Sequence, residues 1–217
     1  MKHKLEADGI QLSFDGRVIL SDIYLQCETG IITGLLGRNG SGKSCLMKII
    51  YGSLPCERSV RFDSISQSEV FKRPDLLHYL PQFTFIPKGL TLQRIFNDFE
   101  LEYSTFGKMF PEFKTKCESS VKSLSGGERR LVELYIIVKS KSQFAMLDEP
   151  FTHLSPIQIE KAKELIIEEK RNKGILITDH LHQHVTGICD SIFVLSKGKT
   201  NLAKSVEDIE TFGYVRL

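Results

Sequence analysis

Tryptophan and any strong net charge are both missing from this 217-residue chain. Lys and Arg number 29 while Asp and Glu number 27, which leaves a formal net charge of +2 at pH 7. So small a charge attracts neither a phosphate backbone nor an anionic membrane surface strongly. Because dedicated nucleic-acid-binding proteins are usually more basic, we expect no nucleic acid among the partners.

Long apolar runs and paired cysteines are missing as well. No stretch reaches the roughly 18 to 20 apolar residues that a membrane-spanning helix needs, and the opening residues MKHKLE are not those of a secretory signal. The five cysteines are odd in number and never spaced as C-x-x-C, so they indicate neither a disulfide framework nor a zinc site. Free thiols favour a cytoplasmic location.

The pattern that is present predicts an α/β fold with a mostly parallel sheet. An antiparallel hairpin is expected first, because apolar residues alternate over 10–14 and again over 23–27, with an Asp15-Gly16 turn after the first run. Prolines interrupt 53–125, which has the character of an inserted lobe. The remaining expected elements are strands at 31–36, 60–62, 144–147, 175–178 and 192–195, and helices at 44–51, 92–101, 128–139, 156–173 and 181–188.

Residues 37–44, GRNGSGKS, fit G-x-x-x-x-G-K-[ST] between a predicted strand and a predicted helix. The glycines let the backbone curl so that consecutive N–H groups point at one anion, and the helix that follows adds its positive end. Lys43 then reaches the outer phosphates and the Ser44 hydroxyl ligates Mg²⁺. The predicted nucleotide-binding residues of this loop are Gly37, Asn39, Gly40, Ser41, Gly42, Lys43 and Ser44.

A second motif is the apolar run 144–147 followed by Asp148 and Glu149. Acid pairs after buried strands often only cap the next loop, and for the pair taken alone that interpretation stays open. In a chain that also has a phosphate loop, Asp148 is the predicted carboxylate of the metal shell. Glu149 is then the candidate for polarising the attacking water.

A third motif, LSGGE over 124–128, precedes a predicted helix. With the phosphate loop, the MLDEP segment and a lone His180 after a strand, it resembles the ATP-binding cassette (ABC) ATPases over nearly the whole chain. The resemblance implies a single ABC ATPase domain over 1–217: a P-loop NTPase core with a mostly parallel sheet, an N-terminal antiparallel β lobe and an inserted helical lobe. It implies core and β lobe at about 1–82 and 140–217, and helical lobe at about 83–139.

The resemblance also implies roles that the bare residues do not indicate. Gln82 would touch Mg²⁺ and water, and His180 would face the γ-phosphate of ATP. Phe14 would stack on adenine, although an ordinary core residue of the hairpin is the alternative. His180, His182 and His184 alternate, so a metal site is another alternative. The implied cofactors are ATP and Mg²⁺, and the implied metal-binding residues are Ser44, Gln82 and Asp148.

Four positions depart from the family pattern. Cys45 stands where threonine is usual near the α-phosphate, so a weak S–H donor replaces a hydroxyl. Glu128 replaces a commoner glutamine, and Phe14 replaces a commoner tyrosine but keeps the stacking face. Ser155 replaces an aspartate that lies across the dimer seam in the family. Either residue can cap the helix that begins at Pro156, so we expect the fold to tolerate the change. For function two alternatives stay open: the lost charge weakens the coupling between ATP sites, or the change is neutral drift between two good caps.

The implied partners are a second cassette and separately encoded transmembrane subunits. The family's site uses the phosphate loop of one subunit and Ser125, Gly126 and Gly127 of the other, so two copies would pair head to tail on ATP. The predicted function is the ATPase subunit of an ABC transporter, peripheral on the inner face of the membrane, with Phe96 and Phe99 meeting the membrane partner. The alternatives are a soluble ABC ATPase resembling the iron-sulfur cluster assembly ATPase, and another P-loop enzyme such as a kinase, which leaves LSGGE unexplained.

Overall fold

The computed structural model describes residues 2–180 and 182–212 and contains two β-sheets. The first is the predicted antiparallel lobe, with strand order β2-β1-β5-β6 and β3 also paired to β1. The Asp15-Gly16 turn has φ of 48° and 77°, the left-handed conformation of a tight hairpin turn. The strands of this sheet are β1 (Lys4–Phe14), β2 (Arg17–Leu20), β3 (Tyr24–Glu28), β5 (Glu57–Phe62) and β6 (Ile65–Ser66).

The second sheet has six strands in the order β11-β10-β4-β9-β8-β7, all parallel except β11. This confirms the mostly parallel core, while β7 and β11 are additions to the predicted strands. The turn at Lys197-Gly198 joins β10 to β11. The strands are β4 (Ile32–Leu36), β7 (Leu77–Leu80), β8 (Phe144–Asp148), β9 (Gly174–Thr178), β10 (Ser191–Ser196) and β11 (Lys199–Ala203).

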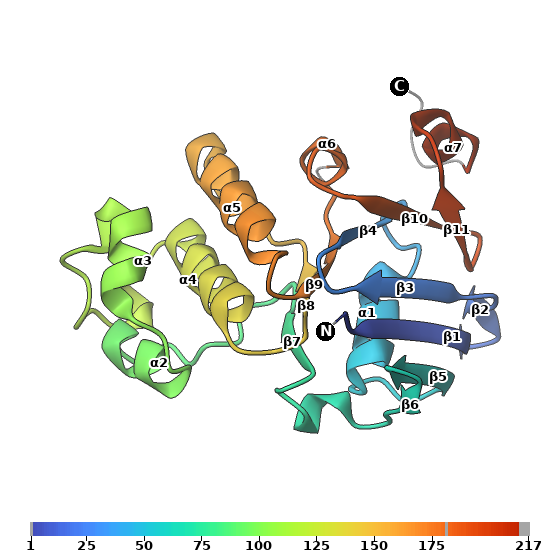
Figure 1. The fold of residues 1–217 in the computed structure, drawn as a ribbon, viewed down its shortest axis with the longest axis horizontal. Coiled ribbons are helices and arrows are strands. Elements are labelled where there is room, and N and C mark those ends of the chain that lie inside the picture. The colour runs from blue at the N-terminus through green and yellow to red at the C-terminus, as the bar shows by residue number, and fades with distance from the viewer. Residues whose placement is uncertain (1, 181, 213–217) are drawn as a thin grey trace.

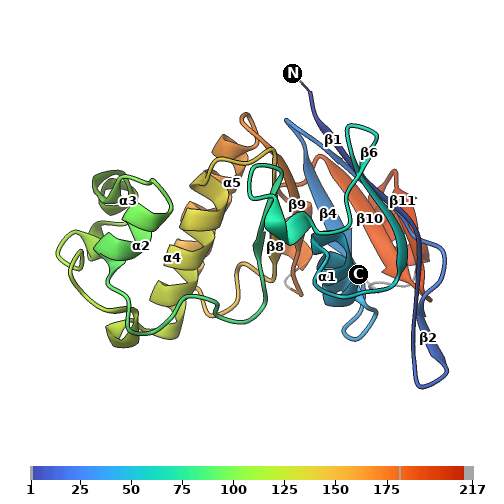
Figure 2. The ribbon, with the colours of Figure 1, turned by 90° about the horizontal axis from the view of Figure 1, so that it is seen from below.

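The parallel sheet is covered on both faces, which explains its nearly continuous apolar runs. Along β8, Phe144 and Met146 join the core around α1 (Lys43–Tyr51), between the two sheets (Figure 2). Ala145 and Leu147 join the opposite core, which includes residues of α4 (Gly126–Lys139) and α5 (Pro156–Glu169). Every residue of β4, β8 and β9 is buried. The remaining helices are α2 (Leu92–Asp98), α3 (Tyr103–Met109), α6 (His182–Thr186) and α7 (Val206–Thr211), and short 3₁₀ turns span Val70–Lys72, Pro111–Phe113 and Val121–Ser123.

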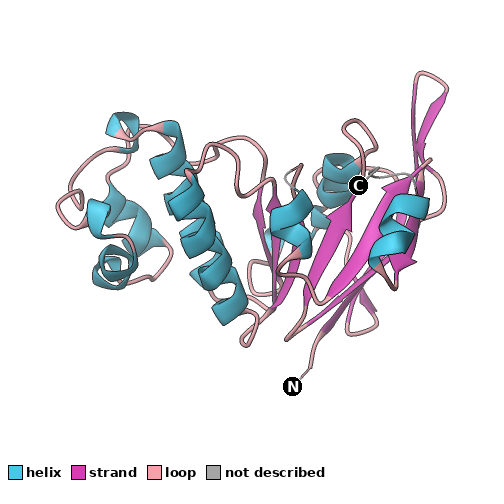
Figure 3. Ribbon diagram, turned by 90° about the horizontal axis from the view of Figure 1, so that it is seen from above, coloured by secondary structure: helices cyan, strands magenta, loops and turns pink. Residues whose placement is uncertain are grey.

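The helices α2 and α3 stand to one side of both sheets, beyond α4 (Figures 1 and 3). Their core is aromatic: Phe96 and Phe106 pack 5.0 Å apart by ring centroid, and both contact Tyr135 of α4. Phe96 is fully buried, so the expectation that it meets a membrane partner is wrong. Phe99 is half-buried and packs against the same core, and for this residue the expectation stays a prediction. The exact division at 83–139 stays a prediction, because α4 also packs against β7 and α5.

Two helices end three or four residues earlier than expected. The helix expected over 156–173 ends at Glu169, and Gly174 begins β9 rather than ending the helix. A Cβ atom at Gly174 would lie 2.6 Å from the Phe144 ring, so close packing against β8 explains this glycine. The helix expected over 92–101 ends at Asp98, where Phe99 caps it.

Candidate functional site

The phosphate loop connects the end of β4 to the start of α1. Gly40 and Gly42 have φ of 76° and 105°, a region that side-chain-bearing residues rarely adopt. A Cβ atom at Gly37 would lie 2.6 Å from the Leu195 carbonyl oxygen, so this glycine is required by close approach to β10. The loop therefore needs its glycines for both conformation and space.

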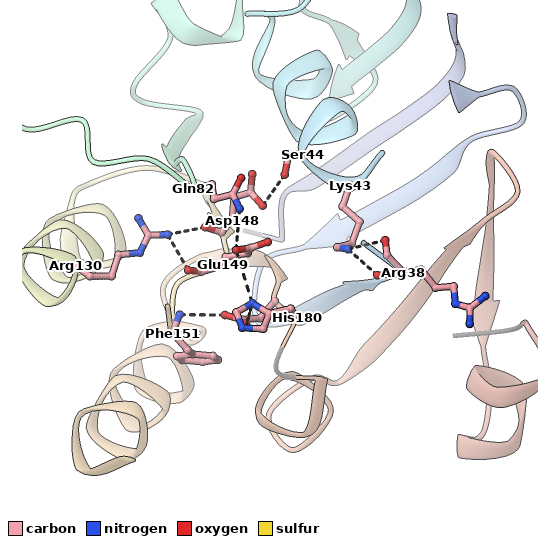
Figure 4. Close-up of polar contacts among 11 residues, drawn as sticks. Arg38, Lys43, Ser44, Gln82, Arg130, Asp148, Glu149, Phe151 and His180 are labelled. Carbon is pink, nitrogen blue, oxygen red and sulfur yellow. Dashed lines mark hydrogen bonds and ion pairs between the residues drawn. The ribbon is translucent and has the colours of Figure 1, made fainter. Parts of the chain in front are cut away.

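Lys43 lies folded against this loop (Figure 4). Its Nζ donates to the carbonyl oxygens of Gly37 at 2.6 Å and Arg38 at 3.2 Å. Burial lowers the pKa of Lys43, and the carboxylates of Glu149 and Asp148 partly oppose that shift. A bound anion would favour the charged lysine, because it offsets the cost of burial.

Asp148 ends β8 and faces the loop. One carboxylate oxygen, Oδ1, accepts from Ser44 Oγ at 3.2 Å, and the other accepts from Tyr79 Oη at 3.1 Å. Burial raises the pKa of Asp148, while the two hydrogen bonds lower it. A buried carboxylate beside a hydroxyl offers the hard oxygen ligands that Mg²⁺ prefers, and a cation there would offset the burial. The donor set of Ser44 and Asp148 therefore fits magnesium.

Three side chains converge from the ends of three neighbouring strands. Gln82 follows β7, Glu149 follows β8 and His180 follows β9, as expected at the carboxyl edge of a parallel sheet. Gln82 Nε2 donates to Glu149 Oε2 at 2.9 Å. His180 Nδ1 lies 3.7 Å from the same oxygen and 3.3 Å from Asp179 Oδ1 (Figure 4). The Glu149 carboxylate therefore lies between the Gln82 amide and the His180 imidazole.

These groups line a cavity of about 610 Å³, large enough for a nucleotide. Phe14 is 48% exposed at this cavity, so it is not an ordinary core residue of the hairpin. Of the lining residues only Ile19 is absent from the predicted site. The lining consists of Phe14, Ile19, Asn39, Gly40, Gly42, Lys43, Ser44, Cys45, Gln82, Glu149 and His180.

The LSGGE segment does not line this cavity. Ser125 caps α4, and its hydroxyl accepts from the Glu128 N–H at 3.2 Å while Glu128 accepts from the Ser125 N–H at 2.8 Å. This reciprocal capping explains why Glu serves here in place of Gln. Gly127 lies against the loop after β8, where a Cβ atom would approach the His153 carbonyl oxygen to 2.5 Å.

Ser155 performs the predicted capping role. Its hydroxyl accepts from the Gln158 N–H at 3.4 Å, Gln158 Oε1 accepts from the Ser155 N–H at 3.0 Å, and Pro156 opens the helix. The expectation that serine caps α5 is confirmed.

A model of one protein family, described as "ABC transporter", matches residues 20–152. The lipopolysaccharide export system ATP-binding protein LptB of Escherichia coli K12 is 31% identical over 211 residues, which cover 89% of this chain and 87% of that protein. This chain belongs to the ABC transporter family. A probable ABC transporter ATP-binding protein of Azorhizobium caulinodans is 30% identical over 220 residues, covering 94% of this chain and 78% of that one.

The fold of this ABC cassette agrees with a solved structure described as the ATP-binding subunit of an ABC transporter. The TM-score is 0.78 at 21% identity, with 97% of this chain and 93% of that chain covered. Membership makes the chain an ATP-binding subunit whose ATPase activity powers a transporter. The soluble iron-sulfur-type alternative is not favoured by these similarities.

The sequence motifs did not predict two polar residues of the cassette's site. Tyr79, which bonds Asp148, lies on β7, a strand that was not predicted although the apolar residues before Pro81 suggest one. Arg130, buried on α4, donates to three backbone carbonyls, of Pro81, Asp148 and Glu149. No local pattern distinguishes it from the exposed arginines that a surface helix carries.

The histidine metal site gains no support. The residues that the structure describes contain no group of three or more His, Cys, Asp or Glu side chains able to hold a metal ion. The His184 ring packs edge-on against Phe151, and the His182 side chain lies outside the described part. Across the described ranges no helix is long and apolar enough to span a membrane.

Proposed function

We propose that the cavity binds Mg-ATP in the roles that the motifs predict. Phe14 stacks on adenine, and Cys45 lies near the α-phosphate. The N–H groups of residues 37–44 and the Lys43 ammonium hold the outer phosphates. The observation that carries this proposal is the convergence of Gln82, Glu149 and His180 on the cavity that the phosphate loop lines.

Ser44 Oγ and Asp148 Oδ1 hold magnesium in this proposal, with Gln82 as a third contact. When bound, the metal supplies positive charge that offsets the charge developing on the phosphates. Glu149 orients the attacking water and takes its proton at Oε1, because Oε2 accepts from Gln82. His180 contacts the γ-phosphate from its position beside Glu149.

A second copy of the chain completes the site. Ser125, Gly126 and Gly127 lie outside the cavity within one chain, at the start of a capped helix whose N–H groups can receive an anion. Two copies paired head to tail bring this segment onto the γ-phosphate bound to the other copy. ATP then holds the dimer closed, and hydrolysis releases it.

The cassette docks on separately encoded transmembrane subunits and so lies at the cytoplasmic face of the membrane. The segment after Gln82 carries Phe83, which is 71% exposed, and Phe85, which is 38% exposed. These two aromatic side chains give the segment an exposed apolar surface, and contiguous exposed apolar surfaces mark protein contacts. This surface, and not Phe96, is the proposed contact with the transmembrane subunit.

The roles are tested with two variants of the purified chain. Lys43→Ala should weaken ATP binding, whereas Glu149→Gln should bind ATP, lose turnover and elute from gel filtration as a dimer when ATP is present. Hydrolysis by Glu149→Gln at the natural rate would show that Glu149 is not the base.

Docking is tested by affinity purification from detergent-solubilised membranes. Phe83→Asp should release a polytopic membrane protein that the natural chain retains. Phe71→Asp is the matched control, because Phe71 is 43% exposed on a different part of the surface. Equal retention by both variants would contradict docking at Phe83.

A further inference from the structure

A buried arginine on α4 joins the two loops that carry the proposed catalytic side chains. Arg130 Nη1 donates to the Pro81 carbonyl at 2.8 Å, next to Gln82. Its Nη2 donates to the carbonyls of Asp148 at 2.6 Å and Glu149 at 2.9 Å. One guanidinium therefore fixes the backbone beside both the Gln82 amide and the Glu149 carboxylate. Figure 4 shows its contacts with the carbonyls of Asp148 and Glu149.

A buried glutamate one turn along the same helix extends this connection. Glu133 Oε1 accepts from the N–H groups of Phe85 at 3.0 Å and Ile86 at 3.4 Å, in the segment that follows Gln82. Its Oε2 lies 3.6 Å from Arg130 Nη1, and the two side chains are only 4% and 0% exposed. Burial lowers the pKa of Arg130 and raises that of Glu133, so each charge depends on the other and on its backbone partners.

Stability alone does not account for such a pair. Buried ion pairs cost desolvation, and apolar residues of similar volume are often as stable or more so. Here the side-chain atoms of Arg130 and Glu133 also form hydrogen bonds with backbone groups of the loops after β7 and β8. Glu149 itself has φ of 52°, the left-handed region that a residue with a side chain adopts at a cost in energy. Arg130 bonds the carbonyls immediately before and after that strained φ.

We infer that Arg130 and Glu133, the α4 clamp, are positioning residues that hold Gln82 and Glu149 in their hydrolytic arrangement. The clamp lies on the helix that begins with Gly126 and Gly127, so displacement of this helix displaces both catalytic loops together. In the segment after β7, the exposed Phe83 lies between Pro81, which Arg130 bonds, and Phe85, which Glu133 bonds, so a partner bound at Phe83 acts on backbone that the clamp holds. The inference rests on the proposed roles of Glu149 and Gln82.

Arg130→Met tests the clamp, and Arg129→Met is the matched control. Arg129 is adjacent on α4 but donates to the Val121 carbonyl, away from the catalytic loops. In Arg130→Met we expect kcat to fall by roughly 10- to 100-fold, because small displacements of catalytic groups have effects of that order. ATP affinity should change by less than about threefold, since the phosphate loop is not held by the clamp. Arg129→Met should change neither quantity.

Hydrogen exchange supplies a readout that does not depend on turnover. Peptides covering 81–87 and 148–151 should exchange faster in Arg130→Met, while the phosphate-loop peptides keep the natural rate. A kcat within twofold of the natural value, faster exchange throughout the chain, or equal effects in Arg129→Met would each overturn the inference.

Arg130→Lys keeps the charge facing Glu133 but cannot span three carbonyls, and it decides the question if the methionine variant does not fold. It should show the same local exchange and an intermediate kcat, and natural behaviour in both would overturn the clamp. Glu149→Gln separates the two hypotheses. This variant should lose turnover without faster hydrogen exchange at 81–87. If Glu149→Gln retains turnover, the proposed role of Glu149 is refuted, but hydrogen exchange in Arg130→Lys still tests the clamp.

Discussion

Alanine substitution at the two consecutive glycines of the LSGGE segment should have different consequences. A Cβ atom at Gly127 would lie 2.5 Å from the His153 carbonyl oxygen, closer than real Cβ contacts come. At Gly126 the nearest atoms belong to the His153 side chain at 3.9 Å, an ordinary van der Waals distance. His153 cannot easily retreat, because it has a positive φ of 67° in the short loop between β8 and α5.

The expected magnitude follows from comparing the two variants. Both replace a glycine in the first turn of α4, so both gain helix propensity of at most about 1 kcal/mol. Only Gly127→Ala is overpacked, and overpacking costs about 1 to 3 kcal/mol. Gly127→Ala should therefore be about 1 to 3 kcal/mol less stable than Gly126→Ala. For a chain of this length each kcal/mol corresponds to about 2 to 4 °C in Tm.

Urea titration of the two purified variants measures the difference directly, provided that the slopes of the transitions agree. Gly127→Ala should also form less ATP-dependent dimer in a Glu149→Gln background, because the LSGGE segment is displaced from the His153 loop. Equal unfolding free energies of Gly127→Ala and Gly126→Ala would refute the packing argument. A displaced loop in Gly127→Ala with unchanged dimer formation would refute the proposed effect on the dimer.

Substitutions at three further positions give distinct outcomes. Tyr79→Phe removes the hydrogen bond to Asp148 Oδ2 and should weaken binding of Mn²⁺ in the presence of ATP, measured by electron paramagnetic resonance, and unchanged metal affinity would contradict the role of Tyr79. Ser155→Ala should lose about 1 kcal/mol of stability through the lost cap, whereas Ser155→Asp should keep it and show steeper cooperativity in ATP; identical Hill coefficients would make the serine neutral. Burial lowers the pKa of Lys173 to about 8, so between pH 8 and about 10.4 the unfolded chain binds a proton that the folded chain has lost. Stability should therefore rise with pH in that window relative to Lys173→Met, and parallel curves in thermal unfolding would contradict the shift.

Much of the candidate site could be predicted because its signals are local. The phosphate loop combines a strand, glycines with positive φ and a helix start within a few residues, so its conformation follows from neighbouring residues. The caps at Ser125 and Ser155 are likewise set within four residues. Glu149 was predicted from the acid pair that follows a buried strand, whereas Gln82 and His180 were implied by the family resemblance. Only the parallel order β7-β8-β9 brings these distant residues to one edge.

The sequence by itself determined the α/β class, the nucleotide chemistry and the helix caps, because periodicity, backbone freedom and capping depend on short stretches of chain. The tertiary structure decided which apolar and charged side chains are enclosed. Phe96 was expected on a docking surface but lies inside an aromatic core. Arg130 and Arg129 are adjacent and chemically alike, yet Arg130 is buried against three carbonyls. The burial of a side chain depends on which residues from distant parts of the chain pack against it, and a local sequence pattern does not identify those residues.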